Sequence, residues 1–249
     1  MSEATSIPRP RTMRIPALDI VRSLALCMMV VFHFVFDLEM FGHVPPSTAT
    51  TGFWRALAVT TAGSFLFLAG VSLYLAHGEG IRWRAFGRRL AILLAAALAV
   101  TIGTYLVFPQ AFVFFGILHS IALCSLLGLA VLRLPALLIA ALAIVVFYAP
   151  DYATSDLFNA RIWWWTGLQN VTPTTMDYEP IFPWFAPFLA GLAAAKAAAA
   201  MGLWARLGND TPPRTLRVVA WPGQHSLIIY LLHQPVLIGL VGGVTFLIR

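Results

Sequence analysis

The stretch from Arg14 to Phe41 constrains the fold most, because it is long and apolar yet contains four ionisable groups. A helix needs about 20 apolar residues to cross a bilayer, and this stretch is longer. At about 100° per residue, Arg22 and His33 fall within about 20° of each other. Asp19 and Asp37 lie within about 40° of His33 by the same arithmetic. Charges inside a span are costly and avoid lipid, so this shared stripe predicts a functional site on the helix.

The composition excludes a soluble globular protein. The chain has 249 residues, of which 60% are hydrophobic and 10% charged, and its mean hydropathy is +0.84. Soluble domains contain about 25% charged residues. We therefore predict an all-α, polytopic membrane helix bundle that forms one domain over residues 14–249, after a mobile cytoplasmic tail at 1–13. The net charge of +6 fits basic cytoplasmic loops, and no soluble basic domain is present to bind nucleic acid.

Apolar segments predict about seven transmembrane helices, and the charges between them predict their orientation. Basic residues concentrate in the N-terminus, in 77–89, at Arg133 and in a basic loop at 203–224, whereas 42–52, 109–110 and 150–179 are uncharged or mainly acidic. Because basic loops stay in the cytoplasm, this alternation places the N-terminus inside and the C-terminus outside. The expected spans are 14–41, 53–76, 90–108, 111–132, a fifth ending at 149–150, 180–201 and 225–248.

His33 is the first candidate catalytic residue. Imidazole is the side chain best suited to take a proton near neutral pH. Asp37 lies one turn away and can fix the tautomer of His33, as a carboxylate does for a catalytic histidine. An intramembrane histidine can instead bond a neighbouring helix. His119, which we expect at a similar depth in its span, is a second candidate with the same two interpretations.

Arginines near the inner surface are candidates for binding an anionic cofactor. Arg22 lies about 16 Å from His33 along the helix axis, and guanidinium matches phosphate in a bidentate way. Asp19 is its i,i+3 partner, although Arg22 could also extend to the interface. Four further arginines either line a phosphate site or only mark the cytoplasmic face: Arg82, Arg84, Arg88 and Arg89.

Further candidates lie toward the C-terminus. His233 and Tyr230 share a helical stripe in the last span. Gln234 either satisfies the carbonyl freed by Pro235 or binds a ligand. Asp177 either caps the sixth helix or binds an outer substrate. The sequence has no metal-ligand spacing, and we therefore expect no metal.

The motifs also follow the order of a known family. The segments are ALDIVRSLALCMMVVFHFVFDLEMFG, SFLFLAGVSLYL, FGILHSIAL, MDYEPIFPWFAPFLAG and QHSLIIYLLHQPV. They resemble the successive signatures of the prokaryotic heparan-alpha-glucosaminide N-acetyltransferase-like membrane proteins, and they cover nearly the whole chain. Arg22, ten residues and then His33 also resembles the Arg-x10-His pattern of membrane acyltransferases that act on extracytoplasmic sugars.

The resemblance implies an enzyme that moves an acyl group, typically acetyl, from cytoplasmic acyl-CoA to a hydroxyl or amine of an extracytoplasmic sugar or glycolipid. It also implies a multi-pass protein of the bacterial cytoplasmic membrane. Arg22 and the arginines of 82–89, with Asp19 and His233, would bind the CoA. Asp177, Tyr230 and Gln234 would bind the acceptor. His33 would act either as a general base or as the group that takes the acyl chain.

Two departures and one alternative accompany this resemblance. Ser23 follows Arg22 where the family usually has glycine. In the heparan-degrading branch the essential histidine lies further along, nearer His43, which makes His43 the second choice for the reactive imidazole. The alternative function is a proton-coupled transporter that uses Asp19, His33, Asp37 and His119, but the chain lacks the repeated halves typical of transporters. Acceptor, acyl length, N- or O-acylation and a homo-oligomeric state stay open.

Overall fold

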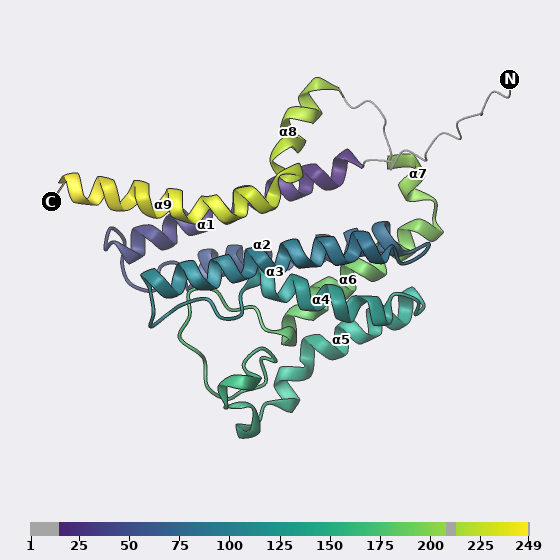
Figure 1. Cartoon of the computed structure of the whole chain (residues 1–249), viewed down its shortest axis with the longest axis horizontal. Coiled ribbons are helices and arrows are strands. Elements are labelled where there is room, and N and C mark those ends of the chain that lie inside the picture. Colours follow the sequence, from purple (N-terminus) through teal and green to yellow (C-terminus); the bar gives the residue numbers. More distant parts are fainter. Residues whose placement is uncertain (1–14, 208–212, 249) are drawn as a thin grey trace, which may run out of the picture.

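The computed structural model describes residues 15–207 and 213–248 (Figure 1). Those residues form α-helices joined by short connections, with two 3-10 turns, η1 and η2, in the longest connection. The predicted tail at 1–13 lies outside the described residues. The elements are α1 Pro16–Met40, α2 Gly52–His77, α3 Trp83–Val107, α4 Ile117–Val131, α5 Ala136–Ala153, η1 Asp156–Phe158, η2 Arg161–Trp163, α6 Ile181–Ala200, α7 Leu203–Leu207, α8 Arg214–Gln224 and α9 Ser226–Ile248.

The predicted polytopic helical membrane bundle is confirmed. Six of the described helices are long and apolar enough to cross a bilayer, namely α1, α2, α3, α5, α6 and α9. The remaining expected span, 111–132, is shorter than predicted, because α4 has only 15 residues. At 1.5 Å per residue it covers about 22 Å, against a hydrocarbon thickness of about 30 Å.

The segment before α4 folds against α3 instead of continuing the helix. The Thr101 hydroxyl donates to the Val113 carbonyl (2.7 Å), and the Val113 amide donates to the Thr104 hydroxyl (3.0 Å). Irregular backbone is tolerated at membrane depth where protein covers it and satisfies its polar groups. Because α3 provides both bonds, α4 begins only at Ile117.

The core forms where α6 packs between its neighbours α2 and α5. Phe188, Leu189 and Leu192 of α6 are fully buried. The approach to α2 is close enough to require glycine on both helices. A Cβ at Gly70 would lie 2.0 Å from the Phe188 carbonyl oxygen, and one at Gly191 would lie 2.0 Å from the Phe67 carbonyl oxygen.

The predicted basic loop at 203–224 is wrong, because much of it is helical. It contains α7 and the eleven-residue α8, which packs against the start of α1. The backbones of the two helices are in close contact, because a Cβ at Gly223 would lie 1.9 Å from the Asp19 carbonyl oxygen. The Gly223 amide also donates to the Ser23 hydroxyl (2.8 Å). The Ser23 hydroxyl thus holds α8 on α1.

Candidate active site

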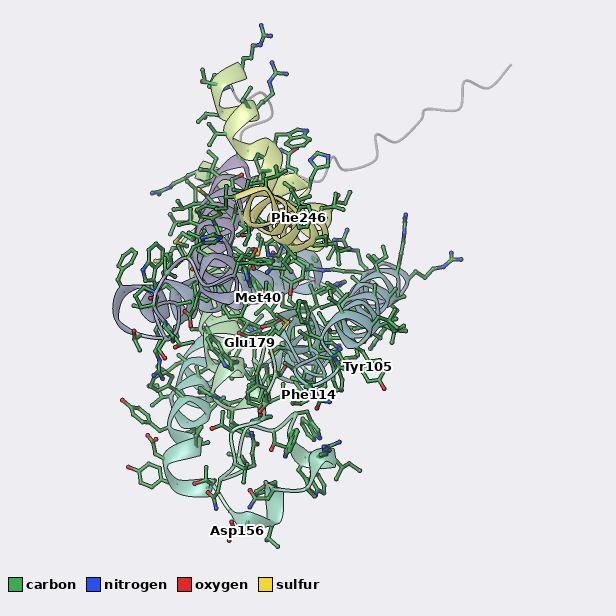
Figure 2. All side chains as sticks on the ribbon, turned by 90° about the vertical axis from the view of Figure 1, so that its left-hand side faces the viewer. Met40, Tyr105, Phe114, Asp156, Glu179 and Phe246 are labelled. Atoms are coloured by element: carbon green, nitrogen blue, oxygen red, sulfur yellow. The ribbon has the colours of Figure 1, made fainter. Side chains whose placement is uncertain are left out.

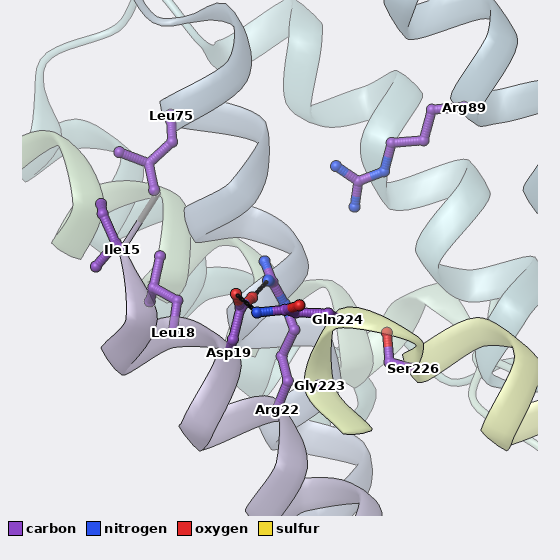
Figure 3. Close-up of a pocket in the computed structure, with 9 residues that line it drawn as sticks. All are labelled: Ile15, Leu18, Asp19, Arg22, Leu75, Arg89, Gly223, Gln224 and Ser226. Atoms are coloured by element: carbon purple, nitrogen blue, oxygen red, sulfur yellow. Dashed lines mark hydrogen bonds and ion pairs between the residues drawn. The ribbon is translucent and has the colours of Figure 1, made fainter. Parts of the chain in front are cut away.

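A cavity of about 430 Å³ opens where α1, α3 and the end of α8 meet (Figure 3). Arg22 forms part of its wall and is held in place from two sides. One guanidinium nitrogen donates to Asp19 Oδ1 (2.7 Å), and the other donates to the Ser72 hydroxyl of α2 (2.6 Å). These bonds fix the orientation of the guanidinium plane, as recognition of a bidentate anion requires.

Arg89 enters the same cavity from α3, on the side opposite Arg22 (Figure 3). Among the residues that the structure describes, Arg89 has no ion-pair partner. The cavity therefore presents two guanidinium groups against the single carboxylate of Asp19. This excess of positive charge favours an anion such as a phosphate.

The other predicted arginines lie elsewhere. Arg82 donates from Nε to the Ala76 carbonyl (3.0 Å) and so satisfies the end of α2. Arg84 and Arg88 are exposed and line neither this cavity nor the next. The predicted cluster of four therefore contributes one residue, Arg89, to the cavity.

A second, narrower cavity of about 110 Å³ continues from the first, with Arg22, Arg89 and Ser226 in both walls. Its walls are mainly apolar side chains of α2, α3, α4 and α9. It extends as far as Ile117 of α4 and Tyr230 of α9. These two adjoining cavities, which share that wall, are called the passage below; its basic mouth lies at Arg22 and Arg89 and its inner end at Tyr230.

The connection between α5 and α6, residues 154–180, is called the outer connection here. It supplies a carboxylate to the far end of this passage. Asp177 Oδ2 accepts from the Ile117 amide (3.1 Å) and from the Tyr230 hydroxyl (3.4 Å). Asp177 thus caps α4 and not the sixth helix, and it also contacts Tyr230. Glu179 lies two residues further, with Oε2 buried and unpartnered among the described residues. Burial, and then the nearby charge of Asp177, raises the pKa of Glu179 well above its ordinary value.

His33 lies next to this end of the passage without lining either cavity. Its ring packs on His233 of α9, with 4.9 Å between the centroids, and His233 in turn packs on Tyr230 at 5.5 Å. The Nδ1 atom of His233 faces the Tyr230 carbonyl, an acceptor, so this nitrogen must donate. In the neutral ring, His233 Nε2 is then an acceptor. This atom and His33 Nδ1 are buried without partners among the described residues.

The family model for the catalytic domain of heparan-alpha-glucosaminide N-acetyltransferase matches residues 14–235. The chain belongs to this family. Comparisons with curated proteins and with solved structures gave no match. Membership in the heparan-alpha-glucosaminide N-acetyltransferase family implies a transmembrane acetyltransferase.

In this family member Asp37 has a different partner from the expected one. The side-chain amide of Gln234 donates to Asp37 Oδ1 (2.7 Å), and Asp37 is fully buried. The described residues show no hydrogen bond between Asp37 and His33, whose Nδ1 has no partner. Gln234 binds the carboxylate because α9 packs against α1 at this level. The ring of His33 is therefore positioned by His233 and not by Asp37.

The other two candidate histidines, His119 and His43, also line neither cavity. His119 Nδ1 accepts from the Gly116 amide (3.3 Å), which leaves its Nε2 to donate to the Thr101 hydroxyl (3.3 Å). His43 Nε2 bonds the Thr245 hydroxyl (2.6 Å) at the outer ends of α1 and α9. The four candidate catalytic residues thus have different partners, and His33 is the one that packs through His233 toward Tyr230 in the cavity wall.

Three polar or glycine residues at the two cavities, Ser72, Gly223 and Gln224, were not among the predicted site residues. Ser72 orients Arg22, while Gly223 and Gln224 form the wall contributed by α8. Ser72 had only a weak signal, because its span also contains the hydroxyl residues Thr60, Thr61 and Ser64. The other two had none, because the helix that presents them was taken for a loop. Among the described residues, no three His, Cys, Asp or Glu side chains lie close enough to hold a metal ion.

Proposed function

We propose that this protein is an acyl-CoA-dependent acyltransferase that moves an acetyl group from cytoplasmic acyl-CoA to a hydroxyl or amine of an extracytoplasmic sugar or glycolipid. The observation that carries the proposal is the passage that joins the Arg22 and Arg89 mouth to Tyr230 and Asp177. The basic segments between the spans favour a mouth on the cytoplasmic side, and the membrane in this proposal is a bacterial cytoplasmic membrane.

The donor half of the proposal rests on matching shape and charge. Coenzyme A combines phosphate groups with a long, flexible thiol arm. Arg22 and Arg89 offer two guanidinium groups to the phosphates. The apolar second cavity is narrow, as an extended chain requires. A thioester at the end of such an arm would lie near Tyr230.

The acceptor half rests on the polar groups beyond Tyr230. Asp177 enters from the outer connection and offers a carboxylate to an acceptor hydroxyl or amine. His33 takes the proton from this group as the acceptor atom attacks the thioester carbonyl carbon. The carbon–sulfur bond then breaks, and the proton returns to the departing thiolate. The products are an acylated acceptor and free coenzyme A, and no net proton is consumed.

The proposal is tested with purified protein in detergent, labelled acetyl-CoA and a panel of amino sugars and plain sugars. We expect free thiol to appear only when an acceptor is present, together with labelled acceptor. Absence of acceptor-dependent thiol release would contradict the proposal. Saturable sugar flux into proteoliposomes without coenzyme A consumption would support the transporter instead.

The base is identified by comparing two histidine variants in the same assay. General-base catalysis typically contributes about 10²–10⁴-fold. His33→Gln should therefore lower kcat by that factor and leave KM for acetyl-CoA nearly unchanged, whereas His43→Gln should retain most activity. The opposite pattern would assign the base to His43 and overturn the role given to His33.

A further inference from the structure

Helix α8 lies crosswise to the membrane spans. In Figures 1 and 2 it projects from the bundle, across the direction shared by α1, α2, α3 and α9. Those four helices follow the membrane normal, since they include spans of 23 to 26 residues. The axis of α8 must then run in the plane of the membrane, at the level of the first turns of α1, with which it packs.

The side chains of α8 divide into two sectors that suit this position. At about 100° per residue, Arg214, Arg217 and Trp221 fall within about 60° of one another. Val218, Val219 and Leu216, which have exposed fractions of 67%, 51% and 40%, follow beyond Arg214 and spread over about 160° of the helix. No residue of α8 is acidic.

Only a small part of α8 is covered by the protein. Ala220 and Gly223 are its buried residues, and they face α1. Trp221 is 56% exposed, and both arginines are exposed. A helix with exposed apolar and cationic sectors, parallel to the bilayer, has the features of an interfacial membrane helix.

We propose that α8 docks on the anionic phospholipid surface of the inner leaflet. Arg214 and Arg217 bind the lipid phosphates, because cationic side chains near the surface attract anionic headgroups. The valines enter the boundary with the acyl chains. Trp221 lies at the headgroup level, where tryptophan side chains collect.

The docked helix also forms part of the basic cavity. Its last turn supplies Gly223 and Gln224 to the wall, and the Gln224 side-chain amide donates to Asp19 Oδ2 (3.3 Å). Asp19 in turn holds Arg22. Anionic lipid that fixes α8 therefore stabilises the arrangement of the Arg22 side of the cavity. This link to donor binding rests on the function proposed above, whereas the docking itself does not.

The docking is tested in nanodiscs of phosphatidylcholine, with and without phosphatidylglycerol. A spin label is placed at residue 218 through Val218→Cys, in a Cys27→Ala background, because Cys27 is exposed and Cys124 is buried. We expect the label to lie deeper, and hydrogen exchange in α8 to be slower, when phosphatidylglycerol is present. Equal depth and equal exchange in the two lipids would overturn the proposal.

Charge-matched variants separate α8 from basic residues in general. Arg214→Gln with Arg217→Gln should abolish the difference between the two lipids. The control, Arg133→Gln with Arg206→Gln, removes the same charge from exposed arginines outside α8 and should keep the full difference. An equal loss in both double variants would show only a nonspecific charge effect and would contradict docking by α8.

The link to the cavity is tested by coenzyme A affinity in the same nanodiscs. We expect a several-fold higher affinity with phosphatidylglycerol, and we expect the α8 double variant to lose this gain. Equal affinities in the two lipids would overturn the link. If coenzyme A binds in neither lipid, the proposed function fails, while the label depth still decides the docking.

Discussion

Asp37 of α1 accepts a hydrogen bond from Gln234 of α9, although the two residues are 197 positions apart in the sequence (2.7 Å). The bond joins two membrane spans through a carboxylate that has no solvent exposure. Asp37 Oδ2 and Gln234 Oε1 are both buried without partners among the described residues. The pair therefore holds α1 to α9 and leaves two acceptor atoms for a donor such as water or substrate.

Replacing one member of this pair should lower the free energy of unfolding more than replacing both. Gln234→Leu leaves the buried carboxylate without its donor, and we expect a loss of about 1–3 kcal/mol in the free energy of unfolding. Asp37→Leu combined with Gln234→Leu should recover much of that loss, because no buried polar group then stays unpaired.

The measurement for these variants is unfolding in detergent followed by tryptophan fluorescence. Gln110→Leu is the control, because Gln110 is exposed in an outer turn, and its stability should match the parent protein. A double variant less stable than Gln234→Leu alone would contradict the argument.

Arg89→Gln should weaken coenzyme A binding. A hydrogen bond to a charged group contributes about 1.5–3 kcal/mol, so its loss corresponds to roughly a 10- to 100-fold rise in Kd. Isothermal titration with coenzyme A measures the effect. Arg84→Gln removes an equal charge from an exposed arginine outside both cavities, and it should change Kd little. Similar losses in both variants would show that Arg89 has no specific role.

Alanine at Gly70 should destabilise the bundle, whereas alanine at Gly63 on the same helix should not. The new Cβ at Gly70 would meet the Phe188 carbonyl oxygen at 2.0 Å, but at Gly63 nothing lies within 4 Å. Overpacking of this kind costs about 1–3 kcal/mol, while Gly63→Ala gains up to about 1 kcal/mol of helix propensity. The measurement is the thermal unfolding midpoint of the two variants, compared side by side. Equal midpoints would contradict the close contact of α2 with α6.

The raised pKa of Glu179 predicts a pH dependence of stability. The folded protein holds this proton more tightly than the unfolded chain, whose carboxyl has a pKa of about 4.3. The contribution of this neutral carboxyl to the free energy of unfolding is therefore fully present below the unfolded-state pKa. It is lost as pH rises toward the folded-state pKa. Glu179→Gln should flatten this part of the profile and be the more stable form at high pH.

The profile is measured as the unfolding midpoint between acid and neutral pH. Asp151→Asn serves as the control, because it removes an exposed carboxyl near the start of the same outer connection. A steeper fall in the Glu179→Gln variant than in the parent protein would refute the assignment.

The sequence predicted the membrane spans well, because their signal is local. Twenty apolar residues in a row identify a span regardless of its neighbours, and six described helices meet that criterion. Two elements were predicted wrongly for a physical reason. The start of α4 depends on Thr101 and Thr104 of another helix, and α8 is too short and too polar overall to look like a span.

The site was predictable only in part. Helical spacing correctly joined Asp19 to Arg22 and grouped His33 with residues facing protein, because these relations lie within one helix. Partners on other helices were not predictable. Asp37 follows the same stripe as His33, yet α9 presents Gln234 to it. Arg89 could not be distinguished from Arg82, Arg84 and Arg88 until the packing of α3 was known.

The late start of α4 leaves the outer half of the bundle without one of its expected helical walls. Beyond Tyr230, non-helical segments take the place of that helix. They are residues 108–116 and the part of the α5–α6 connection that contains Asp177. A molecule that approaches from outside is thus separated from the passage by loops and not by a packed layer of spans. Entry from this side would therefore require loops to move, whereas entry through a packed layer of spans would require whole helices to tilt.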